Sequence, residues 1–155
     1  MIENPAASLA HEILEQRGLD PTLNRILVLS AMIVSPRPLT AAEVYKKVLA
    51  EHKLNRVTVY RILDLFEEHG VVSKISSGER SFRYCARPGR RPHGHCHFHC
   101  TRCGAVQCIE KTLLPFDEKE LTDRLPMDVQ NIELRLDGVC ESCRGVKATI
   151  KENES

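Results

Sequence analysis

The sequence lacks any apolar run long enough to cross a membrane, since no stretch approaches the roughly 18 apolar residues of a spanning helix. Its start has no basic region followed by an apolar segment, the pattern of a secretory leader. It also contains no internal repeat, no low-complexity tract and no H-E-x-x-H motif. We therefore expect a cytoplasmic globular protein without a membrane partner, built from one ordinary domain or two small ones within 155 residues.

Cysteine and charge are distributed unevenly along the chain. All seven Cys lie between Cys85 and Cys143. Residues 1–92 carry 14 Lys and Arg against 10 Asp and Glu, a net charge of +4, whereas residues 93–155 carry 8 against 11, a net charge of −3. Because the cytosol keeps thiols reduced, so many Cys indicate metal binding or redox work rather than a disulfide framework.

A segment rich in Pro, Gly and Arg, "CARPGRRPHG", separates the two halves and is typical of a linker. The predicted organisation is a first domain, a hinge, a second domain and a solvated tail. Their bounds are 1–86, 87–93, 94–148 and 149–155.

The first half shows the pattern of four helices followed by a β-hairpin. The second helix is expected to begin at Pro21, and the third opens with a capping box formed by Thr40 and Glu43. The fourth has apolar residues at i, i+3, i+4 and i+7, and it ends at Gly70. These residues, which are expected to face inward, are Val59, Ile62, Leu63 and Phe66.

Helices followed by the strands "VVSKI" and "SFRYC" indicate a winged helix-turn-helix, in which the helix before the wing enters the DNA major groove. The side chains at or beyond the edges of the apolar stripe are then candidates for base and phosphate contacts. These residues are Arg56, Thr58, Tyr60 and Arg61. The alternative is that they form an ordinary solvated face.

The second half contains two C-x-x-C pairs, "CTRC" and "CESC", separated by 36 residues. Four thiolates in two such pairs are typical of a closed, tetrahedral structural zinc site. The intervening residues predict a strand at 105–110, a helix at 115–125 and a strand at 129–136. The alternative is a pair of redox dithiols, although a thioredoxin-like site needs only one C-x-x-C.

Four His alternate in "HGHCHFH", so a strand would direct all four imidazoles to one face and Cys96 to the other. Cys85 lies across the linker, and Cys108 follows the first C-x-x-C pair. Imidazoles and thiolates near a hinge could form a second, exchangeable metal site that sets the angle between the domains. A nonspecific His-rich tract is the alternative.

The segment "TVYRILDLFEEHGVV", the His-rich strand leading into "CTRCG", and the closing "CESC" together resemble the ferric uptake regulator family. The resemblance implies an α+β fold. A winged helix-turn-helix DNA-binding domain is followed by a small α/β dimerisation domain with a four-cysteine zinc site. It also implies a homodimer that binds palindromic operator DNA when its sensing site holds metal.

The resemblance also assigns roles to residues. Tyr60 and Arg61 match the T-V-Y-R helix, where the family contacts DNA. The structural zinc ligands are matched by Cys100, Cys103, Cys140 and Cys143. Candidates for the regulatory site are Cys85, His93, His95, His97 and Cys108, of which Cys108 stands where zinc-type members have a glutamate. The family's additional site usually has an acid and a histidine at the places of Pro115 and Ile132, so we expect that site to be missing or rebuilt.

Soft thiolate and imidazole donors favour zinc, whereas iron and peroxide sensing favour His with carboxylates. No Asp occurs between Asp64 and Asp117. The resulting prediction is a zinc-responsive repressor of metal-uptake genes that carries structural Zn²⁺ and a regulatory Zn²⁺. An Fe²⁺-responsive or peroxide-sensing regulator of the same family is the alternative.

Two further classes differ from a metal-dependent regulator. A zinc-dependent enzyme would need an open metal position and a nearby general base, for which Glu110 is the only obvious candidate. A zinc-stabilised interaction module would not need the basic first half. We therefore expect a protein that is not an enzyme and that has no small-molecule substrate other than the metal ion.

Overall fold

The computed structural model describes residues 4–76, 82–86, 96–109, 117–129, 132 and 134–145. The chain divides into two compact units, Met1–Pro92 and His93–Ser155. Within the described residues, no helix is both long and apolar enough to cross a membrane. The hinge, the tail, His93, His95, Glu110 and Pro115 of the sequence predictions lie outside the described residues.

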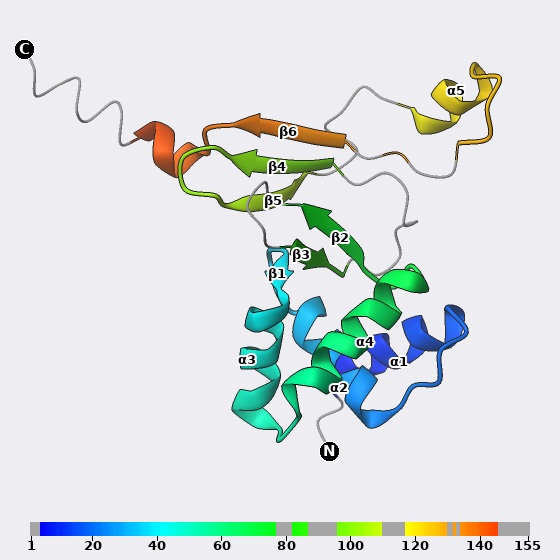
Figure 1. The fold of residues 1–155 in the computed structure, drawn as a ribbon, viewed down its shortest axis with the longest axis vertical. Helices are drawn as coiled ribbons and strands as arrows, with labels where there is room; N and C mark the ends of the chain where they lie inside the picture. The colour runs from blue at the N-terminus through cyan, green and yellow to red at the C-terminus, as the bar shows by residue number, and fades with distance from the viewer. Residues whose placement is uncertain are drawn as a thin grey trace, which may run out of the picture. The chain divides into compact units, whose positions relative to one another are not determined.

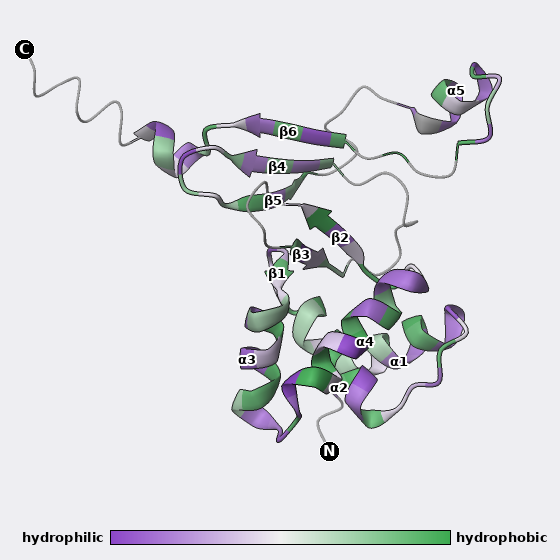
Figure 2. Cartoon of the chain, viewed as in Figure 1, coloured by the Kyte–Doolittle hydropathy of each residue, from purple (hydrophilic) through white to green (hydrophobic). Residues whose placement is uncertain are grey.

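The first unit contains four helices and a small sheet (Figure 1). The helices are α1 (Pro5–Gln16), α2 (Leu23–Ile33), α3 (Ala41–Glu51) and α4 (Arg56–Glu68). Green and purple alternate along these helices in Figure 2, because each helix turns one apolar face inward. The four residues of the predicted apolar stripe on α4 are all buried, which confirms its orientation.

Local signals set the ends of these helices. The Thr40 hydroxyl accepts a hydrogen bond from the Glu43 backbone N–H at 3.2 Å, and the Glu43 carboxylate accepts one from the Thr40 N–H at 2.8 Å. This confirms the predicted capping box. Gly70 follows α4 with a φ of 65°, a conformation that favours glycine after a helix end. The prediction for α2 was wrong by two residues, because Thr22 is its N-cap and Pro21 therefore precedes the helix.

The predicted hairpin consists of β2 (Ser73–Ser76) and β3 (Phe82–Cys85), which pair antiparallel with Lys74 opposite Tyr84. A third strand, β1 (Leu39–Thr40), pairs with the other edge of β3. The sequence analysis missed β1, since two residues are too few to show a strand pattern. Four helices with this sheet form a winged helix-turn-helix.

The second unit contains a three-stranded sheet with the order β5-β4-β6. The central strand β4 (Cys96–Cys100) is antiparallel to β5 (Val106–Ile109) and parallel to β6 (Leu134–Gly138). A short helix, α5 (Glu118–Asp123), lies between β5 and β6 in the chain. The last strand was predicted too early, since it extends to Gly138, where it pairs with Cys100.

Glu43 connects three parts of the first unit. Its carboxylate accepts hydrogen bonds from Arg37 at 2.7 Å and from Arg83 of β3 at 3.4 Å, besides capping α3. The hydrogen bond from Arg37 is the main cause that lowers the pKa of Glu43 to about 2. Glu43 therefore remains ionised in the folded protein at pH values where it would be protonated in the unfolded chain.

We expect Glu43→Gln to lower the free energy of unfolding by about 1–2 kcal/mol at pH 7, a value reduced from the full pKa shift because the site is partly solvated. A lowered folded-state pKa means that this contribution is present above the unfolded pKa. It should disappear as the pH falls from 4.5 towards about 2.

Urea unfolding followed by far-ultraviolet circular dichroism at several pH values measures this difference. The control is Glu51→Gln on the same helix, which should change stability little. A Glu43→Gln effect that stays constant from pH 7 to pH 3 would contradict the charged role of this carboxylate.

Candidate metal centre and nucleic-acid interface

Four thiols gather at one end of the second sheet. The Sγ atoms of Cys100, Cys103, Cys140 and Cys143 all lie within 4.8 Å of one another. The Sγ atoms of Cys103 and Cys140 are 3.8 Å apart. A zinc–sulfur bond of about 2.3 Å gives a tetrahedron with edges of ~3.8 Å. The donor set and its spacing therefore fit a tetrathiolate zinc ion.

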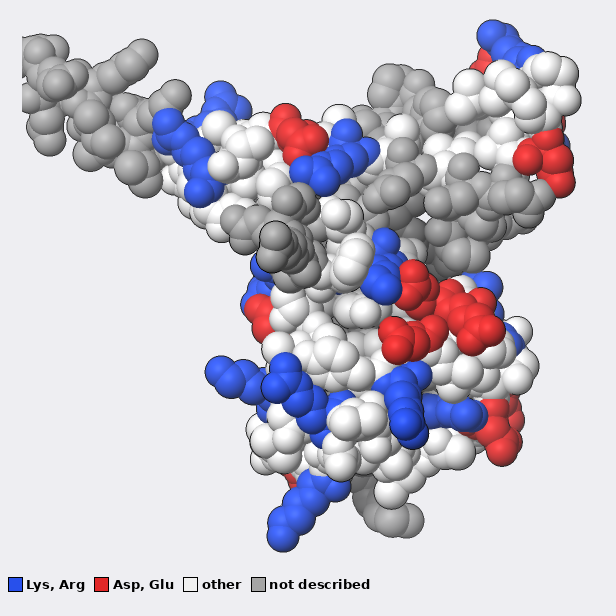
Figure 3. Space-filling view, in the orientation of Figure 1, with Lys and Arg blue, Asp and Glu red and all other residues white. Residues whose placement is uncertain are grey.

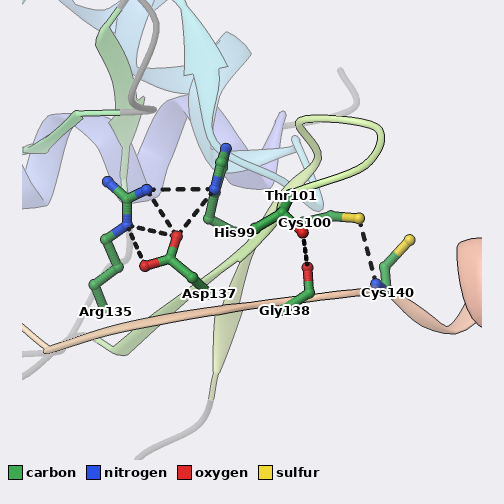
Figure 4. Close-up of polar contacts among 7 residues, drawn as sticks. All are labelled: His99, Cys100, Thr101, Arg135, Asp137, Gly138 and Cys140. Atoms are coloured by element: carbon green, nitrogen blue, oxygen red, sulfur yellow. Dashed lines mark hydrogen bonds and ion pairs between the residues drawn. The ribbon is translucent and has the colours of Figure 1, made fainter.

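The pairing of β4 with β6 brings the two C-x-x-C pairs together. Cys100 ends β4 directly beside Gly138 of β6, and because the strands are parallel, both chains leave the sheet at the same end. The Thr101 hydroxyl donates a hydrogen bond to the Gly138 carbonyl (Figure 4). The Thr101 backbone N–H donates to the same carbonyl, which strengthens this junction. Beyond the sheet, Gly104 turns the first pair with a φ of 71°, and residues 141–145 are helical around the second.

The sulfur atoms of this cluster have unequal electrostatic environments. Backbone N–H groups of Cys103 and Cys140 surround the buried Cys100 thiol and lower its pKa to about 6. Hydrogen bonds with Cys140 and Cys103 raise the pKa of Cys143 to about 12, because neighbouring sulfurs favour its protonated form. A divalent cation would replace these shared protons, since metal binding requires thiolates.

Hydrogen bonds between polar side chains connect β4 with β6 next to the four-thiol cluster. The His99 Nδ1 lies 3.1 Å from Oδ1 of Asp137, and Arg135 donates to the same carboxylate at 2.7 Å (Figure 4). The hydrogen bond from Arg135 is the main cause that lowers the pKa of Asp137. Strand alternation predicts the face of His99 from sequence, but nothing in the sequence identified its partner 38 residues away.

Three of the five residues predicted for the second metal site lie within the described residues, namely Cys85, His97 and Cys108. Within the second sheet, His97 lies directly opposite Cys108, and their ligand atoms are within 4.8 Å of each other. His97 is buried and Cys108 is partly buried. Cys85, also buried, ends β3 in the first unit.

The predicted DNA-contact residues occupy the outer face of α4. Arg56 and Arg61 are exposed, while Thr58 and Tyr60 are partly buried. Arg56 donates a hydrogen bond to the Tyr60 hydroxyl at 3.1 Å and lies 5.4 Å from the centre of its ring. These contacts hold a guanidinium and an aromatic ring together on the helix surface.

Val57 also belongs to this outer face and was missed by the sequence analysis. Val57 is 56% exposed, so it offers an apolar side chain on the same surface as Arg56 and Arg61. Its position opposite the buried stripe of α4 was the signal that could have identified it. In Figure 3, Lys and Arg side chains gather over the lower, helical part of the first unit, whereas acidic side chains gather near the C-terminal end of α4.

Comparison with known proteins agrees with this architecture. The model of the ferric uptake regulator family matches residues 16–137. The chain is 37% identical over 109 residues to the ferric uptake regulation protein of Bacillus subtilis (strain 168), which covers 69% of this chain and 72% of that protein. It is 26% identical over 144 residues to the peroxide-responsive repressor PerR of Staphylococcus aureus (strain Mu50 / ATCC 700699), covering 88% and 95%.

A solved structure of a zinc uptake regulator complexed with zinc and DNA superposes with a TM-score of 0.68 at 26% identity, and the match covers 96% of this chain and 99% of that one. The fold of this chain is therefore similar to that of the solved zinc uptake regulator. The chain belongs to the ferric uptake regulator family, and it is a metal-dependent transcriptional regulator rather than an enzyme.

Proposed function

We propose that this protein is a zinc-responsive repressor of metal-uptake genes that binds palindromic operator DNA as a homodimer. The observation that carries the choice of metal is the His97–Cys108 pair, because an imidazole opposite a thiol is a soft donor set suited to zinc. Iron-responsive and peroxide-responsive functions are the second candidate, favoured by the names of the Bacillus subtilis and Staphylococcus aureus relatives.

The four-thiol cluster holds the structural zinc in this proposal. Tetrahedral coordination by four Cys closes the metal to substrates, so the ion contributes to folding and not to chemistry. The support is the sulfur spacing, together with the Thr101 contacts that join both C-x-x-C pairs at one end of the sheet.

The regulatory zinc is assigned to the hinge candidates Cys85, His93, His95, His97 and Cys108. A metal that takes ligands from both sides of residues 87–93 would favour one angle between the two domains, and therefore one spacing between the recognition helices of a dimer. The sequence supports this assignment through its lack of Asp between Asp64 and Asp117, since iron sites in the family rely on carboxylates.

The recognition helix in this proposal is α4, with Arg56, Thr58, Tyr60 and Arg61 as DNA contacts. An exposed guanidinium can bind guanine bidentately, and an exposed apolar side chain such as Val57 can contact a thymine methyl. The homodimer is supported by large apolar side chains that the second unit leaves exposed. They are Leu121, Leu125, Met127 and Leu136.

Cys100→Ser should remove the tightly bound zinc and destabilise the second unit, because a structural metal contributes its binding energy to folding. Metal analysis of the purified full chain after mild chelation measures this loss. The matched control is Cys96→Ser on the same strand, outside the four-thiol cluster, which should keep one zinc per chain. Retention of that zinc by Cys100→Ser would contradict the tetrathiolate assignment.

Cys85→Ala should leave folding and one zinc per chain intact while abolishing zinc-dependent DNA binding, because it removes only an exchangeable ligand. His97→Ala should shift the zinc response to higher concentration. Titration of DNA binding against buffered free zinc, and separately against Fe²⁺ without oxygen, also distinguishes the two candidate metals. A wild-type zinc response in Cys85→Ala would exclude the hinge site, and a response to Fe²⁺ alone would favour the iron-responsive alternative.

Arg61→Ala should weaken operator binding by about 1–3 kcal/mol if the guanidinium reads a base. Arg61→Lys separates the two kinds of contact, since Lys keeps the charge but not the bidentate geometry. A base contact predicts that Lys fails to restore sequence preference, whereas a phosphate contact predicts nearly full recovery. Operator affinity is measured by fluorescence anisotropy at two salt concentrations. An affinity of Arg61→Ala equal to that of the unsubstituted protein would mean that Arg61 is an ordinary solvated residue and does not contact DNA.

A further inference from the structure

The two residues inside the first C-x-x-C pair, Thr101 and Arg102, both contact the chain that carries the second pair. Thr101 donates two hydrogen bonds to the Gly138 carbonyl, just before the second pair begins. Arg102 contacts the end of that pair, since its Nη1 donates to the Cys143 carbonyl at 3.3 Å. The second pair is therefore held at both of its ends by the first.

The four cysteines of the cluster differ in exposure. Cys100 and Cys140 are buried, whereas Cys103 is exposed and Cys143 is partly buried. Cys140 is also held by its backbone N–H, which donates to the Cys100 sulfur at 3.3 Å. Protons and competing chelators therefore reach the cluster most readily at Cys103 and Cys143, where the loss of a thiolate ligand would begin the loss of zinc.

Cys143 lies beyond the end of β6, in a helical segment at residues 141–145. The hydrogen bond from Arg102 joins the main chain of Cys143 to the first pair, which is 41 residues earlier in the sequence. Once this main chain is fixed, a short side chain leaves the sulfur few positions to occupy. The contact therefore favours the position in which the Cys143 sulfur remains with the other three.

We propose that Arg102 is a positioning residue that keeps Cys143 in the four-thiol cluster and thereby slows the release of the structural zinc. This inference rests on the structural zinc of the proposed function and adds what separates it from the regulatory zinc in time. A sensor responds through a metal that exchanges with its surroundings. The structural metal must stay bound while the regulatory metal binds and leaves.

The charge of Arg102 supports the same role. A divalent zinc ion with four thiolates has a net charge of about −2, and a guanidinium stays protonated at physiological pH. Arg102 therefore places a positive charge at the edge of an anionic group. Its backbone N–H acts in the same direction, because it follows the N–H groups of Cys103 and Cys140 among the hydrogen bonds that lower the pKa of Cys100.

Replacing Arg102 tests this role without removing a zinc ligand. Arg102→Ala deletes the guanidinium and its hydrogen bond from an exposed residue, so the fold should persist. The matched control is Arg144→Ala, because Arg144 is an exposed arginine directly after Cys143 whose side chain forms no hydrogen bond with the first pair among the described residues. Both variants lose one positive charge next to the cluster.

Zinc release from the full chain is followed after addition of excess 4-(2-pyridylazo)resorcinol, a chelating dye whose absorbance changes when it binds zinc. The regulatory zinc should leave in a fast phase and the structural zinc in a slow phase, which Cys100→Ser should lack. Arg102→Ala should accelerate the slow phase about tenfold, because groups that support metal ligands typically contribute about 10- to 100-fold to metal affinity. Arg144→Ala should change its rate by less than about twofold, since salt and water screen an exposed charge.

Salt and a conservative substitution distinguish this role from a general loss of stability. Raising the NaCl concentration from about 50 mM to about 1 M should reduce the rate difference between Arg102→Ala and the unsubstituted protein, because the ions screen the guanidinium charge. Arg102→Lys should release zinc more slowly than Arg102→Ala, since Lys restores the positive charge and a hydrogen-bond donor. Far-ultraviolet circular dichroism verifies that each variant is folded.

A slow phase of Arg102→Ala as slow as that of the unsubstituted protein at low salt would overturn the role of Arg102. Equal acceleration by Arg144→Ala would also overturn it, because the effect would then come from the overall charge and not from the contact with Cys143. The absence of a slow phase from the unsubstituted protein would instead contradict the structural zinc of the proposed function.

Discussion

The metal centre of this protein depends on the parallel pairing of β4 with β6. The register that places Cys100 beside Gly138 makes both chains leave the sheet at the same end, where each immediately forms a C-x-x-C turn. An antiparallel pairing of the same strands would place the two cysteine pairs at opposite ends of the sheet. Thr101 at the Gly138 carbonyl, and the Cys140 N–H at the Cys100 sulfur, are consequences of this one register.

Most of the first unit could be predicted because its signals are local. The buried stripe of α4 and the capping box of α3 join residues three to seven positions apart, so they can be recognised without knowledge of the tertiary structure. The four-cysteine cluster was also predictable, although its ligands are distant in sequence. Two pairs of this spacing are typical of tetrahedral thiolate coordination, whatever topology brings them together.

The features that could not be predicted depend on distant partners. β1 consists of two residues whose strand conformation comes from pairing with β3, more than 40 positions later. The alternation of the histidines predicted on which face of the strand His99 lies. Its hydrogen bond to Asp137, however, depends on the parallel register between β4 and β6. The end of β6 was misplaced for the same reason, since the contact with Cys100 extends this strand to Gly138.

The proposed structural zinc and the pairing of β4 with β6 support each other. Asp137 lies three residues before Cys140, so a metal that holds Cys140 near Cys100 also restrains the end of β6. The His99–Asp137 contact joins the same two strands one residue before Cys100. A slip of β6 by one residue would turn each of its side chains to the opposite face of the sheet and would break this contact. Structural zinc would therefore hold the register of a strand that has only five residues, in addition to holding the four cysteines together.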